Sequence, residues 1–272
     1  MIALVAGAGS VGVGVIVGSN LFNLAALLGL PALVAGGIQI RRGPLILDAT
    51  VGLLITAIAA VMVAGALSPS LALAVTIPLA AVYVFTLSQS HRRIGRLRTL
   101  LASAPHGFDE TAYEVTHDRP RSAHESWFPV ALIPIALIGV VGGSFVMVHQ
   151  ALAAQSWLHL SSAVLGTIVL AALTSLPNLW VALHFARTDR GTALFSSAMN
   201  SNSINLVGGL IVPAIFIGTA VARGSLAYFT WLFDLTLLAV LAPIPHSRLS
   251  RVAGGVIIGI YLLFVGLRVI GV

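Results

Sequence analysis

Apolar segments long enough to cross a lipid bilayer make up most of this 272-residue sequence. Only 8% of the residues are charged, whereas a soluble domain carries about 25%. A bilayer core of about 30 Å is crossed by a helix of about 20 apolar residues, so we predict an all-α, multi-pass transmembrane helix bundle with eight spans. They lie near residues 11–37, 49–67, 70–88, 128–148, 161–185, 192–218, 225–243 and 252–271.

The arginines divide the connections between these spans into two sides. One side holds Arg223 and Arg268, and the other holds Arg41, Arg42, Arg92, Arg93, Arg96, Arg98, Arg119, Arg121, Arg187, Arg190, Arg248 and Arg251. Basic residues concentrate in cytoplasmic loops, so we expect both termini outside and residues 89–127 in the cytoplasm. This placement explains the net charge of +6 without a nucleic-acid partner. The lysine-free composition favours a bacterial source and a location in the cell (plasma) membrane.

Two stretches of the sequence, residues 18–34 and 200–216, nearly repeat each other. The identical pairs are Ser19/Ser201, Asn20/Asn202, Asn23/Asn205, Leu24/Leu206, Leu28/Leu210, Pro31/Pro213 and Ala32/Ala214. Five crossings separate the two helices, so we expect them to run antiparallel. Polar side chains are costly inside a membrane, and their repetition predicts an inverted repeat around a polar site, as in secondary transporters.

A second polar segment, residues 173–178, precedes the second stretch and has the sequence Leu-Thr-Ser-Leu-Pro-Asn. Pro177 removes a helical hydrogen bond and frees a carbonyl one turn earlier. Freed carbonyls and hydroxyls suit hard cations such as Na⁺ or Ca²⁺, although Ser, Thr and Pro also serve packing and kinks in membrane helices. The candidate ion-binding residues are Ser19, Asn20, Asn23, Thr174, Ser175, Asn178, Ser197, Ser201, Asn202 and Asn205.

These motifs resemble the α-repeats of the sodium/calcium (cation/proton) exchanger family. Residues 173–178, followed after about twenty residues by Met-Asn-Ser-Asn-Ser-Ile-Asn-Leu at 199–206, resemble the second repeat. That repeat typically has Gly-Thr-Ser-Leu-Pro-Glu and then Gly-Asn-Val-Ile-Gly-Ser-Asn-Ile-Phe-Asn. Residues 14–23, Gly-Val-Ile-Val-Gly-Ser-Asn-Leu-Phe-Asn, resemble the back half of the first repeat.

The resemblance covers most of the chain and implies a division into two repeat halves. Such proteins usually have ten spans, outward termini and a cytoplasmic central loop, so the eight spans correspond to the third to tenth. Residues 1–88 are then a truncated first half with three spans. A basic and polar loop follows at 89–127, and 128–272 form the second half with five spans.

The sequence departs from the family pattern at several ligand positions. Asn178 stands where the family has a cation-binding carboxylate, and Leu173 replaces a glycine. Val15 and Ser197 occupy the asparagine or aspartate positions of the two repeats, and Met1 falls where the first repeat's own Gly-Thr-Ser-Leu-Pro-Glu helix ends. Two explanations stay open. Either the sequence begins at an internal methionine, or the chain is a divergent member with altered ion choice or lost transport.

The acidic residues bear on the choice of ion. Seven of the eight are predicted in or beside loops, and one within a span: Asp48, Asp109, Glu110, Glu114, Asp118, Glu125 and Asp189, against Asp234. A dehydrated Ca²⁺ without a carboxylate would keep an uncompensated charge in a low dielectric. Neutral oxygens therefore favour a monovalent cation.

The predicted function is a cation antiporter that exchanges Na⁺ or H⁺ against another cation by alternating access. Its partners are the transported cations (Na⁺, Ca²⁺ or H⁺) and the lipid bilayer. The spans contain no Ser-His-Asp or paired-carboxylate arrangement, so we expect no enzyme activity, no cofactor, and no metal site beyond that of the transported cation. The alternative is a degenerate, non-transporting homologue that serves as a membrane scaffold or partner subunit.

Overall fold

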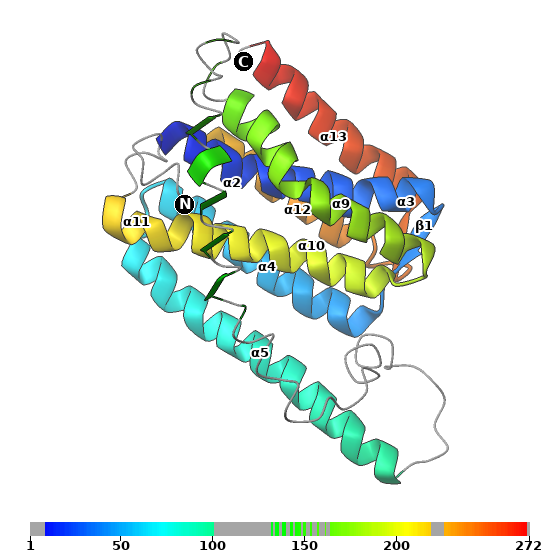
Figure 1. The fold of residues 1–272 in the computed structure, drawn as a ribbon. Coiled ribbons are helices and arrows are strands. Elements are labelled where there is room, and N and C mark those ends of the chain that lie inside the picture. The colour runs from blue at the N-terminus through cyan, green and yellow to red at the C-terminus, as the bar shows by residue number, and fades with distance from the viewer. Residues whose placement is uncertain are drawn as a thin grey trace.

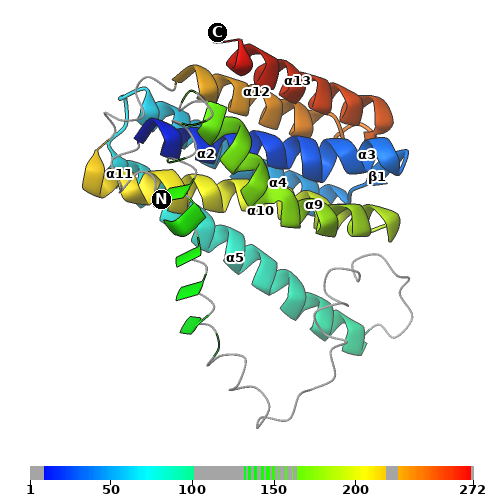
Figure 2. The same cartoon turned by 45° about the horizontal axis from the view of Figure 1, so that its top comes forward.

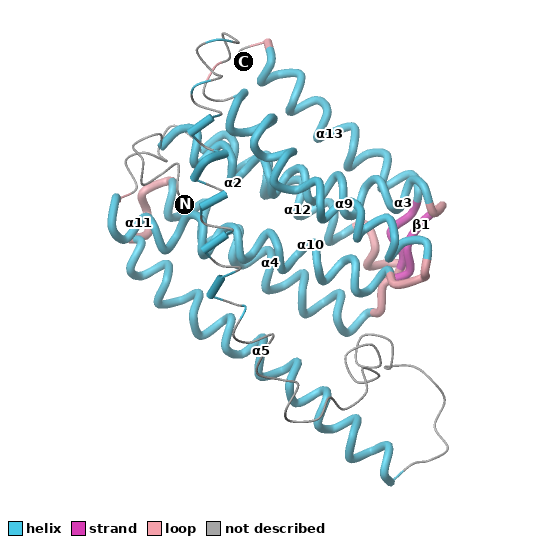
Figure 3. The backbone as a smooth tube through the Cα atoms, in the orientation of Figure 1, coloured by secondary structure: helices cyan, strands magenta, loops and turns pink. Residues whose placement is uncertain are grey.

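The computed structural model describes residues 9–100, 164–218 and 226–270, with scattered residues between 132 and 161. The three continuous ranges form a bundle of helices and one short two-stranded sheet (Figures 1 and 3). The predicted all-α, multi-pass fold is confirmed. Most of the predicted fourth span, 128–148, and the end of the loop 89–127 lie outside the described residues.

The helices of the first half begin with one continuous segment. It consists of α2 (Gly9–Asn23), the π-helical turn η1 (Leu24–Gly29) and α3 (Leu30–Val34). Two further helices follow, α4 (Arg42–Val63) and α5 (Pro69–Leu100). Since α5 continues to Leu100, the start of the predicted loop 89–127 is helical.

The second half has a similar order of helices. It comprises η2 (Leu165–Leu170), α9 (Ala171–Arg187), α10 (Gly191–Leu206), η3 (Val207–Ile211), α11 (Val212–Ile217), α12 (Leu226–Leu241) and α13 (Arg251–Val269). Among the described residues, five helices are long and apolar enough to cross a membrane. The segment from η2 into α9 is a sixth if its bent parts form one span, and α12 is a shorter apolar helix. Each of these helices corresponds to a predicted span.

The two predicted repeats share one backbone pattern and run in opposite directions (Figures 1 and 2). In each repeat, an α-helix passes through a π-turn just before a proline, Pro31 in one and Pro213 in the other. Leu30 donates its N–H to Ala25, and the equivalent Val212 donates to Val207, five residues back in both cases. Proline lacks an N–H and crowds the carbonyl four residues earlier, and a local π-turn is one way in which a helix absorbs such a disturbance.

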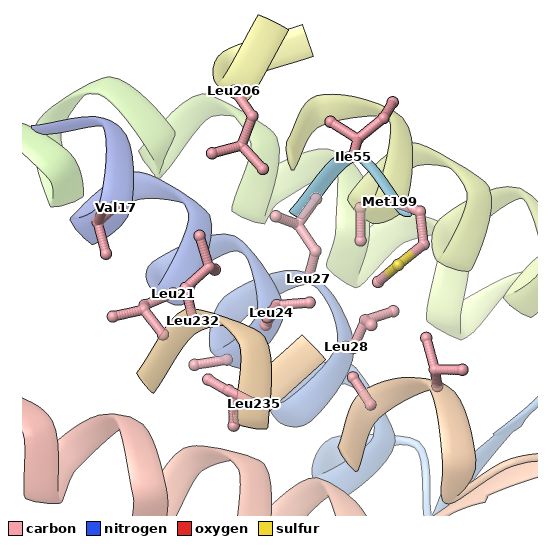
Figure 4. Packing of buried hydrophobic residues seen from close by; sticks show 14 of the residues in the cluster. Val17, Leu21, Leu24, Leu27, Leu28, Ile55, Met199, Leu206, Leu232 and Leu235 are labelled. Carbon is pink, nitrogen blue, oxygen red and sulfur yellow. The ribbon is translucent and has the colours of Figure 1, made fainter. Parts of the chain in front are cut away.

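The α2–η1–α3 segment lies in the middle of the bundle, and most of its residues are buried. Gly18 is so close to the backbone of Thr167 that a Cβ atom there would overlap it. The core side chains labelled in Figure 4 belong to α2 and η1 and to the neighbouring helices α4, α10 and α12: Val17, Leu21, Leu24, Leu27, Leu28, Ile55, Met199, Leu206, Leu232 and Leu235.

A small antiparallel sheet joins β1 (Gly37–Gln39) to β2 (Arg248–Ser250), with Ile38 opposite Leu249. The backbone of Gln39 packs against Gly191 at the start of α10, so both halves meet at this end of the bundle. Five arginines lie at or next to this junction: Arg41, Arg42, Arg190, Arg248 and Arg251. The fold thus gathers arginines that the sequence assigns to one side, and the membrane face to which that side belongs stays a prediction.

Candidate functional site

Four asparagines, two from each repeat, meet between α2 and α10. The Asn20 amide donates to the main-chain oxygen of Asn202, and the Asn202 amide donates to the main-chain oxygen of Asn20, both at 3.2 Å. Asn205 donates to Oδ1 of Asn20 at 2.8 Å, and Asn23 donates to Oδ1 of Asn202 at 3.1 Å. We call these four residues the asparagine cluster.

The asparagine cluster has the two-fold symmetry of the repeat. Asn20 corresponds to Asn202 and Asn23 to Asn205, so each hydrogen bond across the interface has a counterpart with the roles of the two helices exchanged. Helical carbonyls can accept these additional bonds because each carbonyl oxygen has two lone pairs. The identical polar residues of the sequence repeat therefore hold the two antiparallel repeats together.

One buried side-chain atom of this cluster has no partner in the described part of the chain. Asn20, Asn23 and Asn202 are 0%, 1% and 4% exposed, and Asn205 is half-buried. The Oδ1 atom of Asn23 is buried and has no hydrogen-bond partner among the residues that the structure describes. A buried acceptor without a partner costs about 1–3 kcal/mol, and an amide oxygen is a ligand that Na⁺ and Ca²⁺ accept. This atom therefore fits a cation ligand.

Ser19 and Thr174, two of the predicted ligands, form hydrogen bonds within their own helices. The buried Ser19 hydroxyl donates to the carbonyls of Val15 at 2.5 Å and Ile16 at 3.3 Å, within its own helix. The Thr174 side chain is exposed, and its hydroxyl donates to Leu170 at 2.9 Å and Ala171 at 3.0 Å. The structure therefore does not bring Thr174 into the asparagine cluster.

The remaining predicted ligands lie on α9 and α10. Ser175 is buried, whereas Asn178, Ser197 and Ser201 are half-buried. The segments Thr167–Ser175 and Asn178–Arg187 meet at an angle of 55°. This bend lies at Pro177, where the sequence predicts a broken hydrogen bond. Helix α9 packs against α2 and α10, which carry the asparagine cluster, and against η1.

A buried carboxylate was missed in the sequence. Asp48, predicted in or beside a loop, is 3% exposed inside α4 and accepts hydrogen bonds from Tyr83 on α5, at 2.8 Å, and from Ser196 on α10. The predicted span near 49–67 is wrong at its start, because α4 begins at Arg42. Pro44, in the first turn, signals this start because proline is well tolerated there. By contrast, Asp234 of α12 is exposed.

The asparagine cluster and the buried carboxylate are connected through α10. Ser196 and Asn202 are six residues apart on that helix, which corresponds to about 9 Å along its axis. The side chain of Asn200, between them, lies beside the Tyr83 hydroxyl and interacts with it. We call Asp48, Tyr83, Ser196 and Asn200 the Asp48 cluster. Helix α10 thus contributes residues both to the neutral asparagine cluster and to the cluster around the Asp48 carboxyl group.

Comparisons with known proteins find relatives that are partial in length. The chain is 27% identical to an uncharacterized membrane protein of Methanocaldococcus jannaschii over 55% of this chain and 48% of that protein. It is 26% identical to sodium/potassium/calcium exchanger 2 of Mus musculus over 56% of this chain and 24% of the exchanger. The chain therefore spans about half the length of the archaeal relative and about a quarter of the mouse one.

Two solved structures share the fold. The H⁺/Ca²⁺ exchanger CAX superposes with a TM-score of 0.66 over 94% of this chain and 67% of its own, at 16% identity. The sodium-calcium exchanger NCX_Mj superposes with a TM-score of 0.58 over 97% of this chain and 79% of its own, at 24% identity.

The family assignment comes from the whole sequence rather than from one motif. The family described as "Sodium/calcium exchanger protein" matches residues 1–90 and 128–270, which include both repeats. The family is described as one of exchangers, which are transporters, so the chain is not an enzyme. Because the match covers most of the sequence in both halves, this chain belongs to the sodium/calcium exchanger protein family.

Proposed function

We propose that this chain is a membrane cation antiporter that exchanges Na⁺ or H⁺ against another cation. The observation that carries the proposal is the buried, unpartnered Oδ1 atom of Asn23 at the interface of two antiparallel repeats. Inverted repeats with polar residues between them are typical of secondary transporters. Membership of an exchanger family supports the same activity.

The chemistry of the asparagine cluster favours a monovalent ion at this position. Asn20, Asn23, Asn202 and Asn205 offer amide oxygens, which carry no formal charge. A divalent ion dehydrated among neutral ligands keeps its charge uncompensated, whereas a monovalent ion loses less on leaving water. We therefore assign Na⁺ to the cluster rather than Ca²⁺ alone, with the half-buried Asn178, Ser197 and Ser201 and the buried Ser175 as further candidate ligands.

The hydrogen bonds across the cluster suit alternating access. They join neutral groups, so each contributes only about 0.5–1.5 kcal/mol to holding the repeats together. Oδ1 of Asn20 now accepts from Asn205, and Oδ1 of Asn202 accepts from Asn23. The ion would compete with these amide donors for the two oxygens. Binding would therefore loosen one set of contacts between the repeats, and a rocking movement of one repeat against the other would exchange the open side.

The proposed membrane arrangement follows from the arginines. The junction of β1, β2 and the start of α10 lies in the cytoplasm, and both termini lie outside a bacterial plasma membrane. The division into 1–88, 89–127 and 128–272 is part of the same proposal.

The test is Na⁺-driven cation flux in proteoliposomes that contain the purified protein. Asn23→Leu keeps the number and branching of the side-chain heavy atoms but removes the amide oxygen, and we expect flux to fall by about tenfold, the equivalent of a ligand worth about 1.4 kcal/mol. The matched control is Thr236→Val, because Thr236 is also buried but its hydroxyl bonds to Leu232 within α12. Equal flux in Asn23→Leu and in the control would contradict the site.

A second measurement separates transport from a scaffold role. A ligand that binds the folded state raises its stability, so Na⁺ should raise the melting temperature of the wild type and not that of Asn23→Leu. If the wild type shows neither flux nor any cation effect on melting, the chain is a non-transporting homologue.

A further inference from the structure

The Asp48 cluster lies between helices of the bundle and is separate from the asparagine cluster, the proposed Na⁺ site. Three helices contribute to it: α4 supplies Asp48, α5 supplies Tyr83, and α10 supplies Ser196 and Asn200. We propose that Asp48 is a proton-binding site whose proton is coupled to cation exchange. The coupling rests on the proposed antiport, whereas proton binding itself stands on the geometry of the cluster.

Within the described ranges, the partners of the Asp48 carboxyl group are hydroxyls, and none is cationic. Its polar contacts in the described part of the chain are the hydroxyls of Tyr83 and Ser196. An ionised carboxylate inside a membrane protein is costly unless a positive charge neutralises it. A proton is the smallest cation that does so, and it needs no additional ligands.

The two hydroxyls can satisfy both states of the carboxyl group. When Asp48 is ionised, each of its oxygens accepts one hydroxyl proton, as the structure shows. When Asp48 is protonated, it becomes a donor, and a serine or tyrosine hydroxyl can rotate to accept because it carries lone pairs as well as a proton. The Asn200 amide beside Tyr83 offers both a donor and an acceptor to the turned hydroxyl. The cluster therefore loses few hydrogen bonds when the proton moves.

The other titratable residues described on α4 and on the elements packed against it do not neutralise the Asp48 carboxyl group. Helix α4 packs against α5, α10, α12 and η3. The sequences of α10 and η3 contain no titratable residue, and the spanning part of α5, Pro69–Thr86, contains only Tyr83. In α12, Asp234 is exposed and the Tyr228 hydroxyl accepts from Arg268. On α4 itself, Arg42 is exposed and donates to Ser247.

The position of the cluster explains how its proton would be coupled to the ion. Helix α10 carries Ser196 and Asn200 of the Asp48 cluster and Asn202 and Asn205 of the asparagine cluster. A movement of α10 against α2 that opens the asparagine cluster also changes the distance from Ser196 to Asp48 on α4. The proton would therefore be released or taken up when the cation site changes its state.

The direct test of proton binding is infrared difference spectroscopy of the purified protein in nanodiscs. The pH is varied from about 4 to about 9, which spans the ordinary pKa values of carboxyl and imidazole groups. We expect a pH-dependent band of a protonated carboxyl group that disappears in Asp48→Asn and persists in Asp234→Asn, the matched variant of an exposed span acid. If the spectra of the wild type and Asp48→Asn have the same carboxyl bands throughout, the proton site is refuted.

Flux in proteoliposomes tests the coupling separately. A pH gradient across the membrane should change the cation flux of the wild type and of Asp234→Asn. The cation flux of Asp48→Asn should be the same with and without the gradient. A pH-sensitive flux in Asp48→Asn equal to that of the wild type would refute the coupling. If the infrared band of Asp48 is present but neither the wild type nor any variant transports cations, the antiport proposal fails and the proton site stands.

Discussion

The asparagine cluster and the Asp48 cluster are both buried among helices, but they differ in symmetry and in charge. The first consists of neutral amides that occur as equivalent pairs in the two repeats, and its hydrogen bonds are exchanged by the two-fold relation. The second has one carboxyl group on α4 and hydroxyls on α5 and α10. The residue equivalent to Ser196 in the first repeat is Gly14, so the Asp48 cluster is one-sided.

This difference suggests that the two clusters have different roles, the first in binding the transported cation and the second in binding a proton. A symmetric, neutral arrangement keeps similar contacts when the two repeats exchange roles, which suits a site open alternately to both sides. A one-sided carboxyl group distinguishes the two sides of the molecule, which suits a coupling proton. Equivalent positions also diverge in packing, because Gly18 touches the backbone of Thr167 whereas its equivalent, Asn200, reaches Tyr83.

The largest effect is expected at Gly18. In Gly18→Ala, the new Cβ would overlap the Thr167 backbone and force α2 away from η2. Overpacking costs about 1–3 kcal/mol, and we expect about 3 kcal/mol because backbone, rather than a flexible side chain, must move. Unfolding in mixed micelles measures this cost. Gly139→Ala is the control, since no atom of the described residues outside its own helix backbone lies within 4 Å of a Cβ built there, and an equal loss in both variants would contradict the close packing.

A slightly smaller effect tests the symmetry of the asparagine cluster. Asn202→Leu leaves the buried Asn23 amide without its acceptor, and Asn20→Leu does the same to the Asn205 amide. Each should lower the free energy of unfolding by about 2 kcal/mol, because an unsatisfied buried donor costs about 1–3 kcal/mol. Chemical unfolding checks whether the two losses agree within about 1 kcal/mol. A large loss in one variant and none in the other would break the symmetry.

A double-mutant cycle tests the charge of the Asp48 cluster. At about pH 9, where the proposed proton has left Asp48, Tyr83→Phe removes a hydrogen bond to a carboxylate and should cost about 1.5 kcal/mol. In an Asp48→Asn background, the same change should cost about half as much, because a bond between neutral groups is weaker. Equal costs in both backgrounds would mean that Asp48 is already neutral under those conditions.

Single cysteines test the membrane sides without a measurable effect on stability. The natural chain has no cysteine, so one can be introduced at a time. Ser68 and His246 are exposed at opposite ends of the bundle, one after α4 and one next to β2. In intact cells, an impermeant thiol reagent should label Ser68→Cys and not His246→Cys. The reverse pattern would invert the proposed topology and place the Asp48 cluster nearer the outer side.

The sequence alone determined the architecture. Apolar segments of about twenty residues become helices because a bilayer offers no partner for backbone groups. The two Ser-Asn-containing helices are the first and the sixth predicted spans, and this odd difference in order predicts that they run antiparallel. The prolines at equivalent positions predict similar local distortions. The bend at Pro177 also followed from covalent chemistry, since proline has no N–H to donate.

The tertiary structure alone decided which polar atoms meet. Asn205 binds Asn20 while Thr174 turns to its own backbone, and residue type does not distinguish these outcomes. Asp48 is buried because α4 begins seven residues before its predicted start, and Asp234 is exposed because its side of α12 faces away from the bundle. Both outcomes depend on the rotation and the start of each helix, which are set by contacts between segments distant in the sequence.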